Sequence, residues 1–228
     1  MSPPRPAAVL WDMDGTIVDT EPYWMRAETD LVTEHGGSWS PEQGMQLVGS
    51  GLVQSARILQ QAGVALEVDE IIDTLTDRVM VQIDSGLPWR PGARELIAEL
   101  REAGVPIALV TMSIRRMALK VASAIGDGVF DVVIAGDDVE HAKPHPQPYL
   151  LAAERLGVAI GDCVAIEDSE FGLVSAVSSG AATIGVPLHL TLHEAPTHEL
   201  WPTLEGTTLA DLTAALERHH HRATGADA

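Results

Sequence analysis

The sequence has little cysteine, little positive charge and no long hydrophobic stretch. Its single cysteine, Cys163, cannot form an internal disulfide, so we expect a reducing compartment and a cytoplasmic location. This cysteine lies in the apolar run CVAIED, which favours a buried thiol over a reactive one. No run approaches the roughly 20 apolar residues of a membrane-spanning helix. The opening MSPPRPAA also lacks the apolar segment of a signal peptide.

Positive charge is scarce: Lys and Arg number 14 against 33 Asp and Glu, which gives a formal net charge of −19. Such a surface repels the backbone of nucleic acids and anionic membranes, so we expect neither as a partner. It also repels phosphorylated small molecules. A phosphate site in this chain therefore needs local positive charge, from a lysine or from a metal ion.

Short apolar runs alternate with amphipathic segments of helix length along most of the 228 residues. The runs cover residues 7–14, 105–111, 130–136, 163–168 and 181–186, with a weaker candidate at 206–212. None of them alternates strictly between apolar and polar, which is typical of strands buried on both faces. The amphipathic segments between them end in glycine, as helix C-termini often do. The pattern predicts an α/β fold with a doubly wound parallel sheet.

The first two runs are separated by far more chain than one crossover helix requires. Helical periodicity appears at residues 22–35, 50–62 and 68–83, without a good strand run among them. We therefore predict a small helical domain at residues 20–88, inserted into an α/β core of residues 1–19 and 89–228. The tail ERHHHRATGADA, residues 217–228, is expected to be disordered.

Polar residues follow the apolar runs where a parallel sheet would bring them together. In open parallel sheets, ligands bind beyond the carboxyl ends of the strands. The residues at these positions, or in the segment that follows the third run, are Asp12, Asp14, Thr111, Lys143, Glu167 and Asp168. Four carboxylates, a hydroxyl and an ammonium are typical of a divalent-cation site beside an anion site. Oxygen ligands favour Mg²⁺, which would also reduce the repulsion among the carboxylates.

These groups suit phosphoryl transfer. With a cation bound, one aspartate can attack a phosphoryl group and form an aspartyl phosphate. The second aspartate can donate a proton to the leaving oxygen and later take one from water. Lys143 and Thr111 can bind the phosphoryl oxygens that are not transferred.

Four segments, DMDGTIVDT, VTMS, KPHP and EDSEFG, resemble the four ordered motifs of the haloacid dehalogenase-like phosphohydrolase superfamily. The resemblance covers nearly the whole chain, and the helical insert falls where that family places its cap. It implies that Asp12 is the nucleophile and Asp14 the acid–base, with both on Mg²⁺, Asp14 through its backbone carbonyl. It further implies that Asp168 ligates the metal, with Glu167 beside it, directly or through water.

The resemblance also implies that Thr111 and Lys143 bind phosphate. For Ser113 two roles stay open, a contact to phosphate or a cap on the helix that follows. In the insert, Tyr23 and Trp24 are candidate substrate contacts, although packing inside the insert explains them equally well.

The choice among members of the superfamily depends on what the insert contains. Dehalogenases of the family lack the aspartate at position 14, and phosphonatases use a cap lysine, whereas residues 20–88 contain no lysine. β-Phosphoglucomutases carry a histidine where this chain has Trp24 and an arginine where it has Leu52. We therefore predict a Mg²⁺-dependent phosphatase that acts on a small phosphomonoester, such as a sugar phosphate, as a monomer or weak dimer. The alternatives are a sugar phosphomutase of the β-phosphoglucomutase type and a non-catalytic protein that binds a metabolite or a partner.

Overall fold

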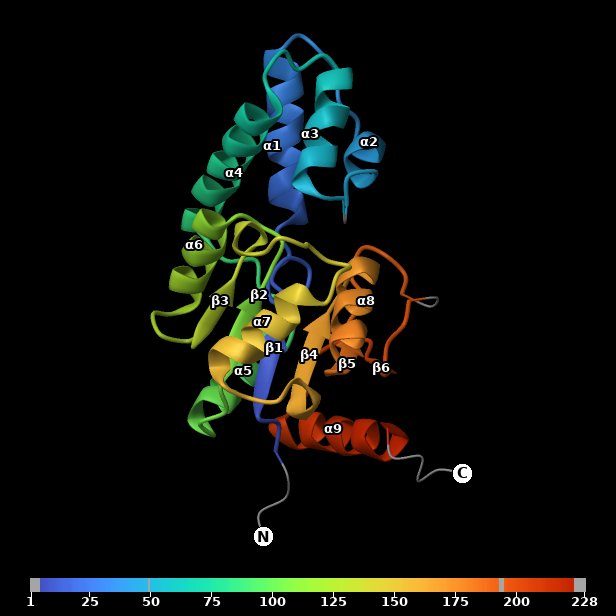
Figure 1. The fold of residues 1–228 in the computed structure, drawn as a ribbon. Coiled ribbons are helices and arrows are strands. Elements are labelled where there is room, and N and C mark those ends of the chain that lie inside the picture. Colours follow the sequence, from blue (N-terminus) through green and yellow to red (C-terminus); the bar gives the residue numbers. More distant parts are fainter. Residues whose placement is uncertain (1–4, 49, 193–194, 224–228) are drawn as a thin grey trace. The chain divides into compact units, whose positions relative to one another are not determined.

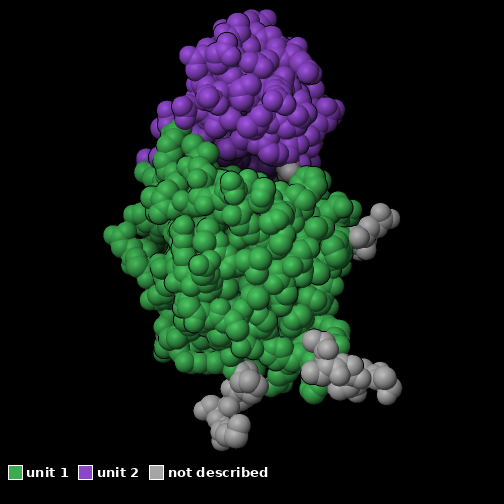
Figure 2. Space-filling view, in the orientation of Figure 1, with its two compact units in different colours: residues 1–18, 89–228 green, residues 19–88 purple. Residues whose placement is uncertain are grey.

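The computed structural model describes residues 5–48, 50–192 and 195–223. The chain divides into two compact units, an α/β unit of residues 1–18 and 89–228 and a helical unit of residues 19–88 (Figure 2). The chain passes between them twice. In the α/β unit, Val18 forms an antiparallel bridge with Trp89. In the helical unit, the N–H of Asp19 donates to the carbonyl of Pro88 at 2.8 Å.

The α/β unit is built on a six-stranded sheet with the order β3-β2-β1-β4-β5-β6, and every pair of neighbours is parallel (Figure 1). The strands are β1 (Ala8–Trp11), β2 (Ile107–Val110), β3 (Val132–Ile134), β4 (Cys163–Glu167), β5 (Ala182–Gly185) and β6 (Glu199–Leu200). Every residue of β1, β2, β4 and β5 is buried, as their mainly apolar character without strict alternation predicts. The predicted α/β fold with a parallel sheet is thus confirmed.

Helices cover both faces of this sheet (Figure 1). They are α5 (Ala93–Glu102), α6 (Arg115–Ile125), α7 (Gln147–Leu156), α8 (Glu170–Ser179) and α9 (Leu209–Ala223), with 3₁₀ turns η1 (Gly136–Asp138) and η2 (Ile160–Asp162). α7 contacts α8, and α5 contacts α9. From β1 the chain adds β2 and β3 on one side, then crosses back to add β4, β5 and β6 on the other. Right-handed crossovers in opposite directions place their helices on opposite faces, and the order reverses between β1 and β4.

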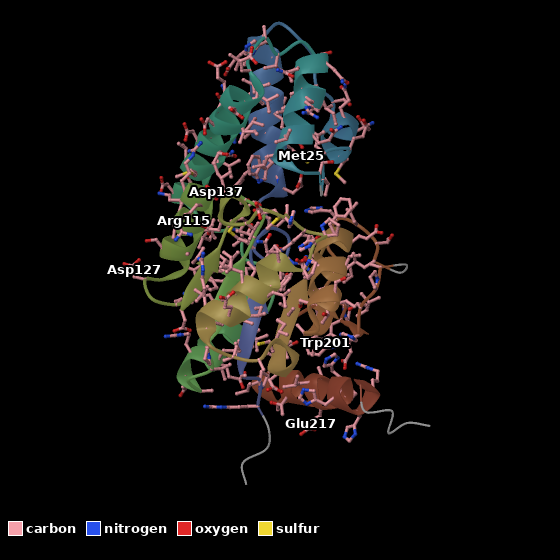
Figure 3. All side chains as sticks on the ribbon, viewed as in Figure 1. Met25, Arg115, Asp127, Asp137, Trp201 and Glu217 are labelled. Atoms are coloured by element: carbon pink, nitrogen blue, oxygen red, sulfur yellow. The ribbon has the colours of Figure 1, made fainter. Side chains whose placement is uncertain are left out.

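The loops after β2 and β3 are held together at the edge of the sheet. The N–H of Gly136 donates to the carbonyl of Ser113 at 2.9 Å. A Cβ at Gly136 would lie 2.5 Å from the carbonyl oxygen of Met112, so only glycine fits this contact. At the start of α6, the N–H of Arg115 donates to the carboxylate of Asp137 at 2.8 Å, and both residues are labelled in Figure 3. These contacts fix the segment that leads from β3 to Lys143.

The helical unit contains α1 (Glu21–Glu34), α2 (Pro41–Met45), α3 (Leu52–Gln61) and α4 (Val68–Ser85). α4 packs against α1 and α3, and α1 also contacts α2. The short helix α2 was not predicted, although its start signal is in the sequence. The hydroxyl of Ser40 accepts from the N–H of Gln43, and the amide of Gln43 accepts from the N–H of Ser40, which together form a capping box.

Two expectations for the C-terminal part are wrong. Residues 206–212 form a turn and the start of α9, and the sixth strand lies at Glu199–Leu200 instead. Residues 217–223 continue α9; the rest of the expected disordered tail lies outside the described residues. The reason is that Leu212 and Leu216 fall at helical spacing and are buried, while Asp211 accepts from the N–H of Thr208 at the helix start. Within the described ranges, no helix is long and apolar enough to cross a membrane.

Candidate active site

The carboxyl ends of β1 and β4 bring three carboxylates together. Trp11 pairs with Ile166 in the sheet, and the N–H of Asp12 donates to the carbonyl of Ile166 at 3.0 Å. One carboxylate oxygen from each of Asp12, Glu167 and Asp168 lies within 4.8 Å of the other two. The sheet register therefore juxtaposes acidic residues that are more than 150 positions apart in the sequence.

Lys143 provides a positive charge inside this cluster. Its ammonium donates to Asp12 Oδ1 at 2.7 Å, to Glu167 Oε1 at 2.6 Å and to the carbonyl of Val110 at 2.9 Å. Burial lowers the pKa of a lysine, but Asp12 and Glu167 outweigh this effect and raise the pKa of Lys143 above its ordinary value. The lysine therefore stays charged and joins the two carboxylates.

Glu167 is fully buried, and protein donors occupy both of its oxygens. Oε1 accepts from Lys143 and, at 2.6 Å, from the hydroxyl of Tyr149. Oε2 accepts from the N–H of Asp168 and from the hydroxyl of Ser169, both at 3.2 Å. The sequence interpretation included neither Tyr149 nor Ser169. The sequence signal that could have found Tyr149 is a tyrosine on an apolar helix face, six residues after Lys143. A buried phenol needs a hydrogen-bond partner.

Asp14 contacts the hydroxyls that follow β2. Its Oδ2 accepts from Ser113 Oγ at 2.8 Å and lies 3.4 Å from Thr111 Oγ1, which in turn accepts from the N–H of Ser113. The alternative that Ser113 caps the next helix is wrong, because Ile114 occupies the N-cap position of α6. All predicted polar residues of the α/β unit thus lie in two adjoining groups, one around Asp12 and one around Asp14.

Gly15 allows the chain to turn directly after the aspartate pair. Its φ of +82° lies in the left-handed region that favours glycine. A Cβ there would lie 1.9 Å from Oδ2 of Asp168, so a side chain at position 15 would displace that carboxylate. The glycine of DMDGT is therefore needed for the turn and also for the approach of β4.

The cluster carries more negative charge than one lysine neutralises. Burial, together with Glu167, raises the pKa of Asp12 to about 7 although Lys143 opposes the rise. Burial, Asp12 and Glu167 also raise the pKa of Asp168 well above its ordinary value. The described residues donate no hydrogen bond to the carboxylate of Asp168. A crowded set of oxygen donors with excess negative charge fits a hard divalent cation such as Mg²⁺. The residues present therefore fit the predicted metal.

Tyr23 and Trp24 lie in the first turn of α1, in the helical unit. The hydroxyl of Tyr23 donates to the carbonyl of Gly86 at 3.1 Å, and Trp24 is half-buried. Leu52, which stands where mutases carry an arginine, begins α3. Contacts of Tyr23 and Trp24 with a substrate stay a prediction.

Comparison with known proteins supports the family that the sequence motifs resemble. A family model described as haloacid dehalogenase-like hydrolase matches residues 6–180. Hexitol phosphatase B of Escherichia coli is 31% identical over 195 residues, which cover 82% of this chain and 86% of that protein. A phosphorylated carbohydrates phosphatase of Thermotoga maritima is 30% identical over 187 residues, 80% of this chain and 85% of that protein.

A solved structure, CbbY from Rhodobacter sphaeroides in complex with xylulose-1,5-bisphosphate, matches with a TM-score of 0.82 and 31% identity. The match covers 91% of this chain and 99% of the CbbY chain. The family match spans most of the chain, and the motifs that suggested it lie around one site. The chain therefore belongs to the haloacid dehalogenase-like hydrolases.

Proposed function

We propose that this protein is a Mg²⁺-dependent phosphatase that hydrolyses a small phosphomonoester, a sugar phosphate or a similar metabolite, through an aspartyl phosphate on Asp12. The observation that carries the proposal is the placement of Lys143 between Asp12 and Glu167, beside Asp168. The relatives named as hexitol phosphatase and phosphorylated carbohydrates phosphatase support a phosphoric monoester hydrolase and this class of substrate.

Asp12 and Asp168 are the side chains proposed to hold Mg²⁺, with the backbone carbonyl of Asp14. When bound, the ion would lower the repulsion between carboxylates and substrate and polarise the phosphoryl group. Glu167 is proposed to orient Lys143, since protein donors already occupy its oxygens. This choice favours an indirect role among the two that the sequence left open for Glu167.

The reaction then proceeds in two displacements. The carboxylate of Asp12 attacks phosphorus, the ester P–O bond breaks, and Asp14 gives its proton to the departing alkoxide. Water then attacks the aspartyl phosphate while Asp14 takes one of its protons, which releases inorganic phosphate and restores Asp12. Lys143, Thr111 and Ser113 are proposed to bind the phosphoryl oxygens as charge develops on them.

Hydrolysis is preferred over the two alternatives. A mutase needs a cationic group for the second phosphate of a bisphosphate intermediate, and Leu52 and Trp24 occupy the positions of its arginine and histidine. A non-catalytic binding protein would not need both aspartates, and Asp12 and Asp14 are both present within the acidic site.

The helical unit is proposed to act as the family's cap and to limit the substrate to small molecules, because enclosing the phosphoryl group excludes bulk water. A folded phosphoprotein should then be a much poorer substrate than a sugar phosphate. Comparable rates on the two would contradict this part of the proposal.

The test is phosphate release from a panel of hexitol phosphates, sugar phosphates and sugar bisphosphates, with Mg²⁺ and with excess chelator. Activity should require Mg²⁺, and Asp12→Asn should abolish it because the amide keeps the shape and removes the nucleophile. Substantial turnover by Asp12→Asn would contradict the proposal. With β-glucose 1-phosphate and a trace of its bisphosphate, glucose 6-phosphate forming faster than free phosphate would show a mutase instead.

A further inference from the structure

A tyrosine on α7 contacts both members of the Lys143–Glu167 ion pair. Tyr149 is fully buried, and its hydroxyl donates to Glu167 Oε1 at 2.6 Å. The ammonium of Lys143, which donates to the same oxygen, lies 5.2 Å from the centroid of the Tyr149 ring. That distance is within the range of a cation–π interaction. One side chain therefore contacts the carboxylate through its hydroxyl and the ammonium through its ring.

The surroundings of Tyr149 do not require a hydroxyl for packing. Its ring belongs to the hydrophobic core cluster that includes Ala108, Val110 and Ile134. A phenylalanine would fill the same volume without a polar atom, and burying a hydroxyl costs free energy unless it forms a hydrogen bond. The hydroxyl of Tyr149 donates its hydrogen bond to Glu167, and this bond offsets the cost of burying the hydroxyl.

Helix α8 and two donors near its start also confine the carboxylate of Glu167. A Cβ at Gly172 would lie 2.0 Å from the carboxylate carbon and oxygens of Glu167, so α8 passes too close for any side chain at that position. The N–H of Asp168 and the hydroxyl of Ser169 hold Oε2. Glu167 therefore has a fixed position, and Tyr149 is one of only two side-chain donors among the described residues to Oε1.

We propose that Tyr149 is a positioning residue for the phosphatase reaction: by sharing Glu167 Oε1 with Lys143, it sets the position from which Lys143 reaches Asp12. This inference rests on the proposed function. Without the hydroxyl, Lys143 is the remaining donor to Oε1, and the ammonium is drawn toward Glu167 and away from the nucleophile. The ring of a phenylalanine would keep the cation–π contact, so Tyr149→Phe isolates the hydroxyl.

The first experiment compares Tyr149→Phe with Thr183→Val. Thr183 is a matched control, because it is also buried in the α/β unit and its hydroxyl donates to the carbonyl of Ala181 at 3.1 Å, away from the acidic cluster. We expect Tyr149→Phe to lower kcat about tenfold with KM changed less than about twofold, since a misplaced catalytic group affects the reacting state more than binding. Thr183→Val should keep kcat at a similar melting temperature. An unchanged kcat in Tyr149→Phe, or an equal loss in both variants, would overturn the proposal.

A double-mutant cycle tests whether Tyr149 acts through Glu167. Glu167→Met removes the carboxylate and fills its space. In that background, Tyr149→Phe should have little further effect on kcat, since the two changes break one contact. Fully additive losses would show that Tyr149 acts by another route and would contradict the proposal.

A second readout does not need turnover. The chain has only two tyrosines, so labelling tyrosine with ¹³C at Cζ gives two resonances, and Tyr149→Phe identifies one of them. That resonance should shift in Glu167→Met and in Lys143→Met, but not in Thr183→Val. No shift in either variant would overturn the proposed arrangement. If the resonance shifts in these variants but the wild-type protein releases no phosphate from any substrate of the panel, the proposed function is refuted and the arrangement around Tyr149 stands.

Discussion

Two buried glutamates, one in each unit, have opposite surroundings. Glu167 in the α/β unit is 0% exposed and accepts from Lys143, Tyr149 and two further donors. Glu28 in the helical unit is 3% exposed, and its Oε2 has no hydrogen-bond partner in the described part of the chain. Burial raises the pKa of Glu28 to about 7, a rise that the nearby indole N–H of Trp39 only partly opposes.

The difference shows two ways of accommodating a carboxylate away from water. The α/β unit places a lysine beside the carboxylates, and Lys143 opposes the rise that burial causes in the pKa of Asp12. Among the described residues of the helical unit no such cation lies beside Glu28, and burial favours its protonated form instead. The packing there is close: a Cβ at Gly44 would lie 3.2 Å from Met25, which is labelled in Figure 3, and 3.6 Å from Glu28 Oε2. A cation is thus present beside the carboxylates of the candidate active site, and the described residues of the helical unit give Glu28 none.

The largest effect on activity should come from removing Lys143, the cation beside the buried carboxylates of the α/β unit. Lys143→Met keeps most of the volume but leaves Asp12, Glu167 and Asp168 without an ammonium. We expect phosphatase turnover to fall at least about a hundredfold, because a preorganised positive group is lost from the reacting centre. The measurement is kcat with saturating Mg²⁺. A loss below tenfold would mean that the lysine is only structural.

A more selective loss should follow from Asp14→Asn, because the proposed role of Asp14 is to protonate the leaving oxygen. A sugar alkoxide must be protonated as it leaves, whereas nitrophenolate is a stable anion. We expect turnover to fall about a hundredfold on a sugar phosphate and much less on p-nitrophenyl phosphate. Equal losses on both substrates would leave Asp14 with metal binding alone.

The buried Glu28 should make stability depend on pH. Its folded-state pKa of about 7 exceeds the ordinary value of 4.5, so the folded protein keeps the proton longer than the unfolded chain. Its favourable contribution is complete below pH 4.5, falls as pH rises to about 7 and is absent above that. The total change is about 3 kcal/mol in the free energy of unfolding. Glu28→Gln, a neutral isostere, should remove this component, as measured by urea unfolding at a series of pH values.

The control for Glu28→Gln is Asp30→Asn, an exposed change on the same helix, which should leave the pH profile as it is. The comparison must be made as a difference between variants, because other groups titrate too. Burial lowers the pKa of His198 to about 4, so His198 contributes a loss of stability as pH falls below 6.5, opposite in sign to Glu28. A wild-type profile that matches Glu28→Gln throughout would contradict the unpaired carboxylate.

The smallest effect should come from an ion pair at the surface. Arg218 donates to both carboxylate oxygens of Glu199, at 2.7 and 2.9 Å, but its side chain is half exposed. We expect Arg218→Ala to lower the free energy of unfolding by less than about 1 kcal/mol, because solvent and salt screen exposed pairs. If Arg218→Ala lowers the free energy of unfolding as much as breaking a buried ion pair does, solvent exposure does not explain the difference between surface and buried pairs.

The sequence predicted what depends on periodicity and on the ends of strands. Five apolar runs became the strands β1 to β5, and the polar residues after them converged, because parallel strands place their carboxyl ends on one edge of the sheet. The short strand β6 was missed because two residues carry no period. Residues 206–212 looked like a strand, yet capping by Asp211 and burial of Leu212 made them part of a turn and a helix.

By itself, the sequence determined the parallel sheet, the helical composition of residues 20–88 and the candidate active-site residues from Asp12 to Asp168, since each follows from local pattern or from a motif at a strand end. Only the tertiary structure decided which donors each carboxylate receives. Glu167 receives the hydroxyl of Tyr149 because α7 packs against β1, a neighbour of β4 in the sheet. Glu28 lies beside Gly44, and its Oε2 receives no hydrogen bond from the described residues. Partners of this kind depend on how distant segments pack, which local sequence patterns do not specify.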